Sequence, residues 1–125
     1  MQDLEIYIRD LELAKLTEWL GNQLDNLVLS EPASATAAIK GAGDYRGHRV
    51  RISAYPGASG KRYTSLVLEA DELPWNTDLE CARSAWRAMD GEIRCSQGEW
   101  QEGEPVEEEK WWRLDDRGEQ LVVWN

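Results

Sequence analysis

The chain has 125 residues, with 24 Asp and Glu against 14 Lys and Arg, so its formal net charge is −10. An apolar fraction of 42% is enough for the core of one domain and excludes a disordered acidic chain. A charge this negative argues against nucleic-acid binding, which needs a positive field, and no apolar run is long enough to span a bilayer. Since the N-terminus also shows no signal region, we expect one cytoplasmic globular domain over residues 1–125.

The first third of the chain predicts a strand, a helix and a second short strand. Apolar residues alternate over 4–8, which is typical of a half-buried strand. Asp10 follows as the expected N-cap of a helix whose leucines recur at spacings of three and four. Residues 27–29 then predict a short strand. The apolar stripe of the helix consists of Leu13, Leu16, Leu20 and Leu24, flanked by Trp19.

The middle of the chain predicts three further strands. We place one near 36–40, followed by a glycine-rich turn at 41–44. Val50, Ile52 and Ala54 alternate with polar residues and indicate a strand. After a loop at 56–60, residues 63–70 return as a strand, and we expect these last two strands to form a hairpin.

The last third predicts a helix and three strands. Thr77 and Glu80 have the spacing of a capping box, which marks a helix start, and Asp90-Gly91 marks its end. A strand at 92–95, a Glu-rich surface loop at 97–109, and strands at 110–114 and 119–124 follow, the last two joined by a tight turn. The expected core stripe of the helix is Leu79, Ala82, Trp86 and Met89.

These elements predict an α+β fold in the order β-α-β-β-β-β-α-β-β-β. We expect two helices packed on one face of a mostly antiparallel sheet, because each element has one apolar face to bury. The chain has seven Trp and no Phe, so indoles take over packing that Phe usually shares, and several should lie at a surface or groove edge. The other face of the sheet should therefore be partly open and carry Trp.

Charge is distributed unevenly. Residues 45–68 contain five bases and no acid, in a chain that is acidic on both sides. This basic hairpin is a candidate anion-binding element, and internal pairing of its bases with acidic neighbours is the favoured alternative. The candidate anion-binding residues are Arg49, Arg51, Lys61 and Arg62.

The densest acidic run lies between 99 and 109, with one indole inside it and two directly after it. Acidic residues around exposed indoles favour docking of a basic partner, since the charge speeds association and Trp anchors the contact. The alternative is a solvated loop leading into a strand whose two Trp face opposite ways. The candidate partner-binding residues are Trp100, Glu102, Glu104, Glu107, Glu108, Glu109, Trp111 and Trp112.

Motifs for catalysis or cofactor binding are absent from the sequence. One His and two distant Cys do not make a zinc site, and the glycine-rich loop at 57–60 matches neither a nucleophile elbow nor a phosphate-binding loop. His48 is expected to be a solvated turn residue, and Cys81 a small buried side chain, with Cys81 and Cys95 as thiols. We therefore expect no metal and no cofactor.

The leading functional hypothesis is a non-enzymatic interaction module that binds a basic protein, as inhibitors and toxin-neutralising immunity proteins do by analogy. The alternative is a module that binds a small molecule in a Trp-lined groove beside the basic hairpin. An enzyme ranks third, because no nucleophile, base and orienting group can be placed together from the sequence.

Overall fold

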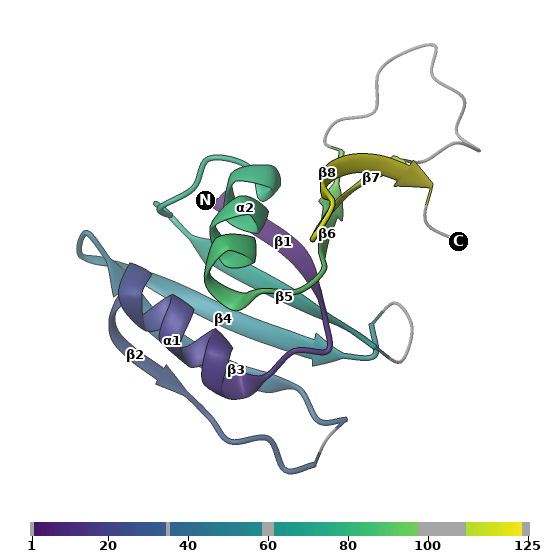
Figure 1. Cartoon of the computed structure of the whole chain (residues 1–125). Helices are drawn as coiled ribbons and strands as arrows, with labels where there is room; N and C mark the ends of the chain where they lie inside the picture. The colour runs from purple at the N-terminus through teal and green to yellow at the C-terminus, as the bar shows by residue number, and fades with distance from the viewer. Residues whose placement is uncertain (1, 35, 59–61, 98–109, 124–125) are drawn as a thin grey trace.

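The computed structural model describes residues 2–34, 36–58, 62–97 and 110–123, which form two helices and one open antiparallel sheet (Figure 1). The eight strands lie in the order β2-β3-β4-β5-β1-β6-β7-β8. The predicted α+β class and the predicted order of elements are confirmed. The elements are β1 Gln2–Arg9, α1 Leu13–Gln23, β2 Asp25–Leu29, β3 Ile39–Tyr45, β4 His48–Pro56, β5 Tyr63–Ala70, α2 Asp78–Met89, β6 Ile93–Ser96, β7 Lys110–Asp115 and β8 Gly118–Val123.

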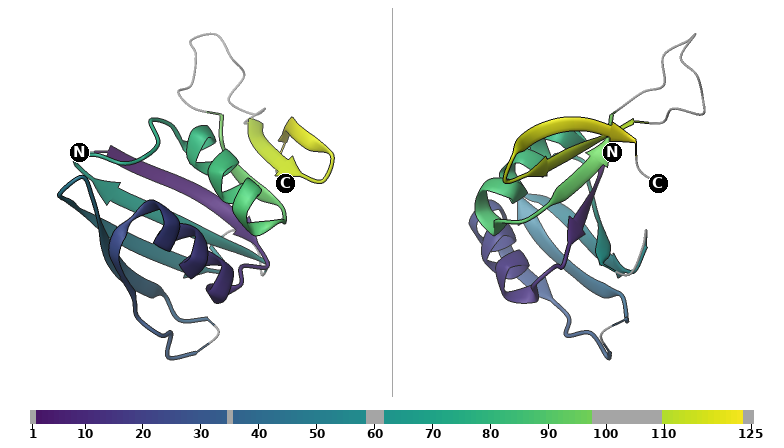
Figure 2. Two further views of the ribbon diagram at one scale, coloured as in Figure 1. Left: turned by 60° about the vertical axis from the view of Figure 1, so that its left-hand side comes forward. Right: turned by 45° about the vertical axis from the view of Figure 1, so that its right-hand side comes forward.

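Both helices cover the same face of the sheet (Figures 1 and 2). Alternate residues of β1, β4 and β5 point toward the helices, and burying each of these Leu or Ile side chains stabilises the fold by roughly 1.5–3 kcal/mol. Neither helix is long and apolar enough to cross a membrane. The core between sheet and helices includes Leu4, Ile6, Ile8, Val50, Ile52, Leu66 and Leu68 from the strands, and Leu16, Trp19, Leu20, Ala82 and Ala85 from the helices.

The predicted turn at 41–44 is wrong, because these residues belong to β3. The turn lies at Arg46 and Gly47, which both have positive φ, as a two-residue hairpin turn requires. Gly41 serves strand packing instead: a Cβ at this position would lie 2.4 Å from the carbonyl oxygen of Val28 in β2. A glycine in this chain therefore marks a close approach of two strands.

The predicted N-cap of α1 is also wrong. Glu12 occupies the cap position and its side chain makes no capping hydrogen bond. Asp10 instead has a φ of 51° and turns the chain sharply between β1 and α1. The capping box of α2 is confirmed, since the Thr77 hydroxyl accepts a hydrogen bond from the Glu80 amide at 3.1 Å. The expected core stripe of α2 is shifted: Cys81 and Ala85 are buried with Ala82 and Met89, whereas Leu79 and Trp86 are half-buried.

The sheet has a narrow seam between β1 and β6. β1 pairs with β5 through eight residues but with β6 through only two, Tyr7 with Arg94 and Ile8 with Ile93. Strands β6, β7 and β8 turn away from the rest of the sheet beyond this seam (Figure 2). Near the start of β1, the Asp78 carboxylate of α2 accepts a hydrogen bond from the Glu5 amide at 3.0 Å. The first residue of α2 thus accepts a β1 backbone hydrogen bond that a neighbouring strand would otherwise accept.

Candidate functional site

Most of the predicted partner-binding residues lie outside the described residues. This applies to Trp100 and to Glu102, Glu104, Glu107, Glu108 and Glu109. The segment 98–109 that contains them connects β6 to β7, which pair with each other from Ile93–Leu114 to Ser96–Trp111. Their role stays a prediction.

The two indoles after this segment are described, and they lie on opposite faces of β7. Trp111 is half-buried on the open face, where its ring meets that of Tyr7 edge-on with centroids 5.5 Å apart. Trp112 is half-buried on the helical side and packs against the core. The expectation that one of these two indoles lies on the open face is confirmed by the contact with Tyr7.

The structure does not bring the predicted anion-binding residues together. Arg49 and Arg51 lie near the start of β4, where Arg51 is opposite Glu69 of β5 in the strand register. Arg62 lies at the other end of this hairpin, just before β5. Lys61 lies outside the described residues. Two of the four are in ion pairs, since Arg49 lies 3.3 Å from an Asp44 oxygen and Arg62 binds the Asp10 carboxylate.

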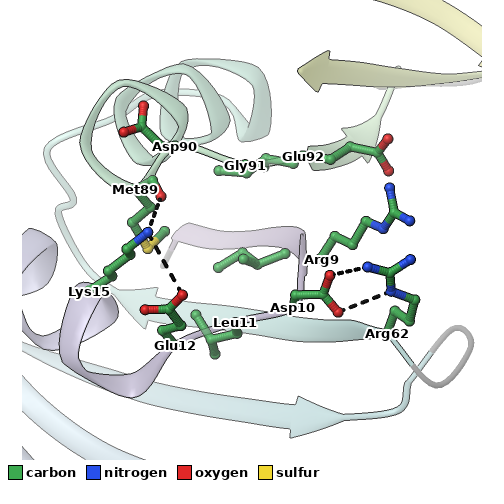
Figure 3. Close-up of a pocket in the computed structure, with 12 residues that line it drawn as sticks. Arg9, Asp10, Leu11, Glu12, Lys15, Arg62, Met89, Asp90, Gly91 and Glu92 are labelled. Atoms are coloured by element: carbon green, nitrogen blue, oxygen red, sulfur yellow. Dashed lines mark hydrogen bonds and ion pairs between the residues drawn. The ribbon is translucent and has the colours of Figure 1, made fainter. Parts of the chain in front are cut away.

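A hollow of about 290 Å³ opens where the chain passes from β1 to α1 and from α2 to β6 (Figure 3). Both passages contain a non-glycine residue with positive φ, Asp10 at 51° and Asp90 at 48°. The Arg9 amide donates to the Glu92 carbonyl at 3.0 Å, which holds the two passages side by side. Backbone turns therefore set the shape of this hollow.

The floor of the hollow is apolar and its rim is charged. Ile8 and Ile93 at the seam, Leu11, and Met89 at the end of α2 provide the apolar side chains. On one side of the rim, Lys15 contacts the Met89 carbonyl at 3.4 Å. The arginines stand on the other side, as Figure 3 shows.

Most of the charged groups on this rim are paired. Arg62 donates to both carboxylate oxygens of Asp10, one of them at 3.1 Å. These hydrogen bonds hold the pKa of Asp10 below its ordinary value, and the charges of Arg62 and Arg9 lower it further. Glu92 accepts from the Arg94 guanidinium at 3.0 Å and from the Tyr63 hydroxyl. Burial, and then the hydrogen bond to Glu92, raise the pKa of Tyr63.

Arg9 differs from these groups, because it forms no ion pair with another residue in the described part of the chain. In the view of Figure 3 its guanidinium group projects between the Glu92 carboxylate and the guanidinium group of Arg62. Arg9 also lines a second hollow of about 460 Å³ on the other side of Gly91. That hollow includes Trp86 and Arg113.

The features that the sequence offered for catalysis lie elsewhere. His48 is 3.5 Å from Glu72 and lines neither hollow. Cys81 and Cys95 are buried free thiols, as expected. Burial raises the pKa of Cys95 to about 12 and that of Cys81 well above its ordinary value, so both stay protonated at neutral pH. The described residues contain no group of three or more potential metal ligands.

The two hollows do not form a Trp-lined groove. The indole of Trp86 is the single one that lines the larger hollow, and none lines the smaller one. Trp19 and Trp75 are buried against each other in the core, with ring centroids 5.3 Å apart. In these two hollows, the described residues offer a ligand a charged rim and an apolar floor, and the Trp-lined groove stays a prediction.

Sequence reasoning missed Arg9, Asp10 and Glu92 as members of one site. Arg9 lies just after the alternating residues 4–8, and Asp10 was interpreted as the N-cap of the first helix. What brings them to Glu92 is the pairing of β1 with β6, two strands far apart in sequence. Asp90-Gly91 marked the end of the second helix and Glu92 the start of the next strand, but no local pattern names the strand that lies beside it.

Comparison with protein-family models, with curated proteins and with solved structures finds no match to this chain.

Proposed function

We propose that this protein is a non-enzymatic interaction module, of an inhibitor or immunity-like kind, that binds a basic protein partner. The observation that carries the proposal is the internal pairing of the basic hairpin. Arg46 lies 3.1 Å from Glu72, Arg49 lies 3.3 Å from Asp44, and Arg62 binds Asp10.

This pairing leaves a surplus of negative charge. The described residues carry 18 acids and 13 bases, and segment 98–109 adds six Glu and no base. With Arg46, Arg49 and Arg62 occupied by acids of the same chain, the field that a distant partner meets is negative. Such a field raises the association rate with a positively charged protein and disfavours acidic ones.

The half-buried indole of Trp111 offers a contact of a second kind. Trp is enriched among the residues that contribute most to binding free energy, and Trp111 is separated from the acidic segment by Lys110 alone. Charge would then govern the rate of encounter, and the aromatic contact the lifetime of the complex.

The test is affinity capture from the native host over a series of salt concentrations. We expect a basic protein to be retained at low salt and released as salt screens the charges. Reversing two charges with Glu107→Lys plus Glu108→Lys should abolish retention. The matched control, Asp25→Lys plus Glu31→Lys, changes the net charge equally at exposed positions near β2 and should weaken retention only slightly.

Three results would count against the proposal. These are recovery of no partner, retention that does not depend on salt, and equal losses for the two double variants. The last result would indicate that net charge alone causes the retention.

A further inference from the structure

We propose that the hollow between β1, α1 and α2 binds a small organic anion, with its charged group on Arg9 and Arg62 and its apolar body on Leu11 and Met89. This site is independent of the acidic segment and of the proposed protein partner.

The apolar floor sets the size and character of the ligand. A volume of about 290 Å³ lies at the lower end of the roughly 300–1,000 Å³ typical of ligand pockets, so the ligand is small. Binding pockets typically combine such an apolar lining with a few polar groups that fix orientation. The carbon chain of a short carboxylate therefore matches the floor of Leu11, Met89, Ile8 and Ile93.

The rim sets the charge of the ligand. The acids nearest the arginines are neutralised within the protein, Asp10 by Arg62 and Glu92 by Arg94. Asp90 points away from the hollow in Figure 3. Arg9 is left without an ion-pair partner among the described residues, and it lines the same hollow as Arg62. A carboxylate that reaches Arg9 forms charge-assisted hydrogen bonds with it, and Arg62, whose donors are shared with Asp10, adds a second guanidinium group on the same rim.

The negative net charge of the protein opposes this binding only at long range. The Debye length at physiological ionic strength is about 8 Å, so most of the acids act weakly on a ligand within the hollow. Contacts with Arg9 and Arg62 act at hydrogen-bonding distance, where screening is least effective.

The experiment is a titration of the isotope-labelled full chain with four probes, followed by nuclear magnetic resonance. Hexanoate carries both features of the proposed ligand. Hexan-1-ol lacks the charge, acetate lacks the apolar body, and hexylammonium reverses the charge. We expect hexanoate to give saturable shifts at the Leu11 and Gly91 amides and the Met89 methyl group, with a Kd at least about tenfold lower than that of any other probe.

The matching variant is Arg9→Gln, which keeps the backbone hydrogen bond to Glu92 and should raise the Kd of hexanoate at least about tenfold. Arg49→Gln is the control, because it removes an arginine that lies outside the hollow. Equal Kd values for hexanoate and hexan-1-ol, no saturable shift, shifts confined to other residues, or equal effects of the two variants would overturn the proposal. The probe series on the unaltered chain decides the question even if Arg9→Gln does not fold.

Discussion

The β1–β6 seam divides the sheet into two parts, and each part is stabilised by a different kind of interaction. Strands β3, β4, β5 and β1 pair over six to eight residues each, β2 joins them through three residue pairs, and these strands bury apolar residues under both helices. Strands β6, β7 and β8 join them through two residue pairs and contribute three buried apolar side chains, Ile93, Cys95 and Leu114. The larger part thus depends on packing, whereas the smaller part depends more on specific polar contacts.

One such contact ties β8 to α2. The Arg83 guanidinium binds both oxygens of the Glu119 carboxylate, at 2.6 and 3.0 Å.

The two edge strands of the sheet differ in how regularly they pair with their neighbours. Edge strand β2 has a register shift between Asp25 and Val28, whereas β8 pairs with β7 without interruption. An irregular edge resists pairing with other chains, so β2 is the better protected of the two.

The largest effect is expected where packing in the larger part is tightest. Gly41→Val places a branched side chain against the Val28 carbonyl, where even a Cβ would lie at 2.4 Å, and should destabilise the fold by about 3 kcal/mol or more. Ala42→Val is the control, because Ala42 faces the open side of the same strand. Thermal unfolding of both variants checks this. A Gly41→Val protein as stable as the control would show that β2 can move aside at little cost.

A smaller effect is expected at the contact between the two helices. The buried Trp19 indole donates to the Ser84 hydroxyl at 3.0 Å, so Ser84→Ala leaves its N–H unpaired and should cost about 1–3 kcal/mol. Thr17→Ala removes an exposed hydroxyl that bonds within α1, and should change stability by less than about 0.5 kcal/mol. Denaturant unfolding measures both changes, and similar losses for the two variants would argue that the indole finds another partner.

The smallest effect on global stability is expected at the salt bridge of the smaller part. Glu119→Gln should lower the Tm by no more than about 3 °C, because both side chains are partly exposed. In Glu119→Gln, amide hydrogen exchange should become faster than in the original chain at β7 and β8, and should stay unchanged in β4 and β5. Faster exchange spread evenly over the whole sheet would contradict the distinction between the two parts.

The pH dependence of this salt bridge has a definite sign. Hydrogen bonds from Arg83 lower the pKa of Glu119 below its ordinary value of 4.5. A carboxyl with a lowered pKa in the folded state stabilises the fold above its ordinary pKa, and this contribution is lost as pH falls through the lowered value. The difference in Tm between the original chain and Glu119→Gln should therefore vanish at acidic pH and be constant near neutrality.

The sequence predicted those parts of the fold that local patterns specify. Alternation located β1, β4 and β5, leucine spacing located α1, and the capping box located the start of α2. Gly41 was misread because a glycine that permits close strand approach resembles a glycine that permits a turn. The place of β1 between β5 and β6 had no local signal, since it depends on contacts between distant segments.

The lack of a local signal for contacts between distant segments also limited the prediction of the candidate sites. Charge counting identified Arg62 as a candidate anion-binding residue, but grouped it with Arg49 and Arg51 from the far end of the hairpin. Its actual ion-pair partner is Asp10, which follows β1, and Arg9 at the end of β1 lines the same hollow. A pattern of charge along the chain shows how much charge a segment carries, whereas the sheet order determines which charges meet.

The positive φ angles of Asp10 and Asp90 have a consequence for how this protein can vary. Both residues are exposed, and each adopts a conformation that glycine adopts at lower cost. Substitution of either residue can therefore shift the wall of the hollow without altering a core side chain. Variation at these two turns therefore changes the rim of the hollow, and its effect on stability comes from the backbone conformation of the turn and not from the packed interior.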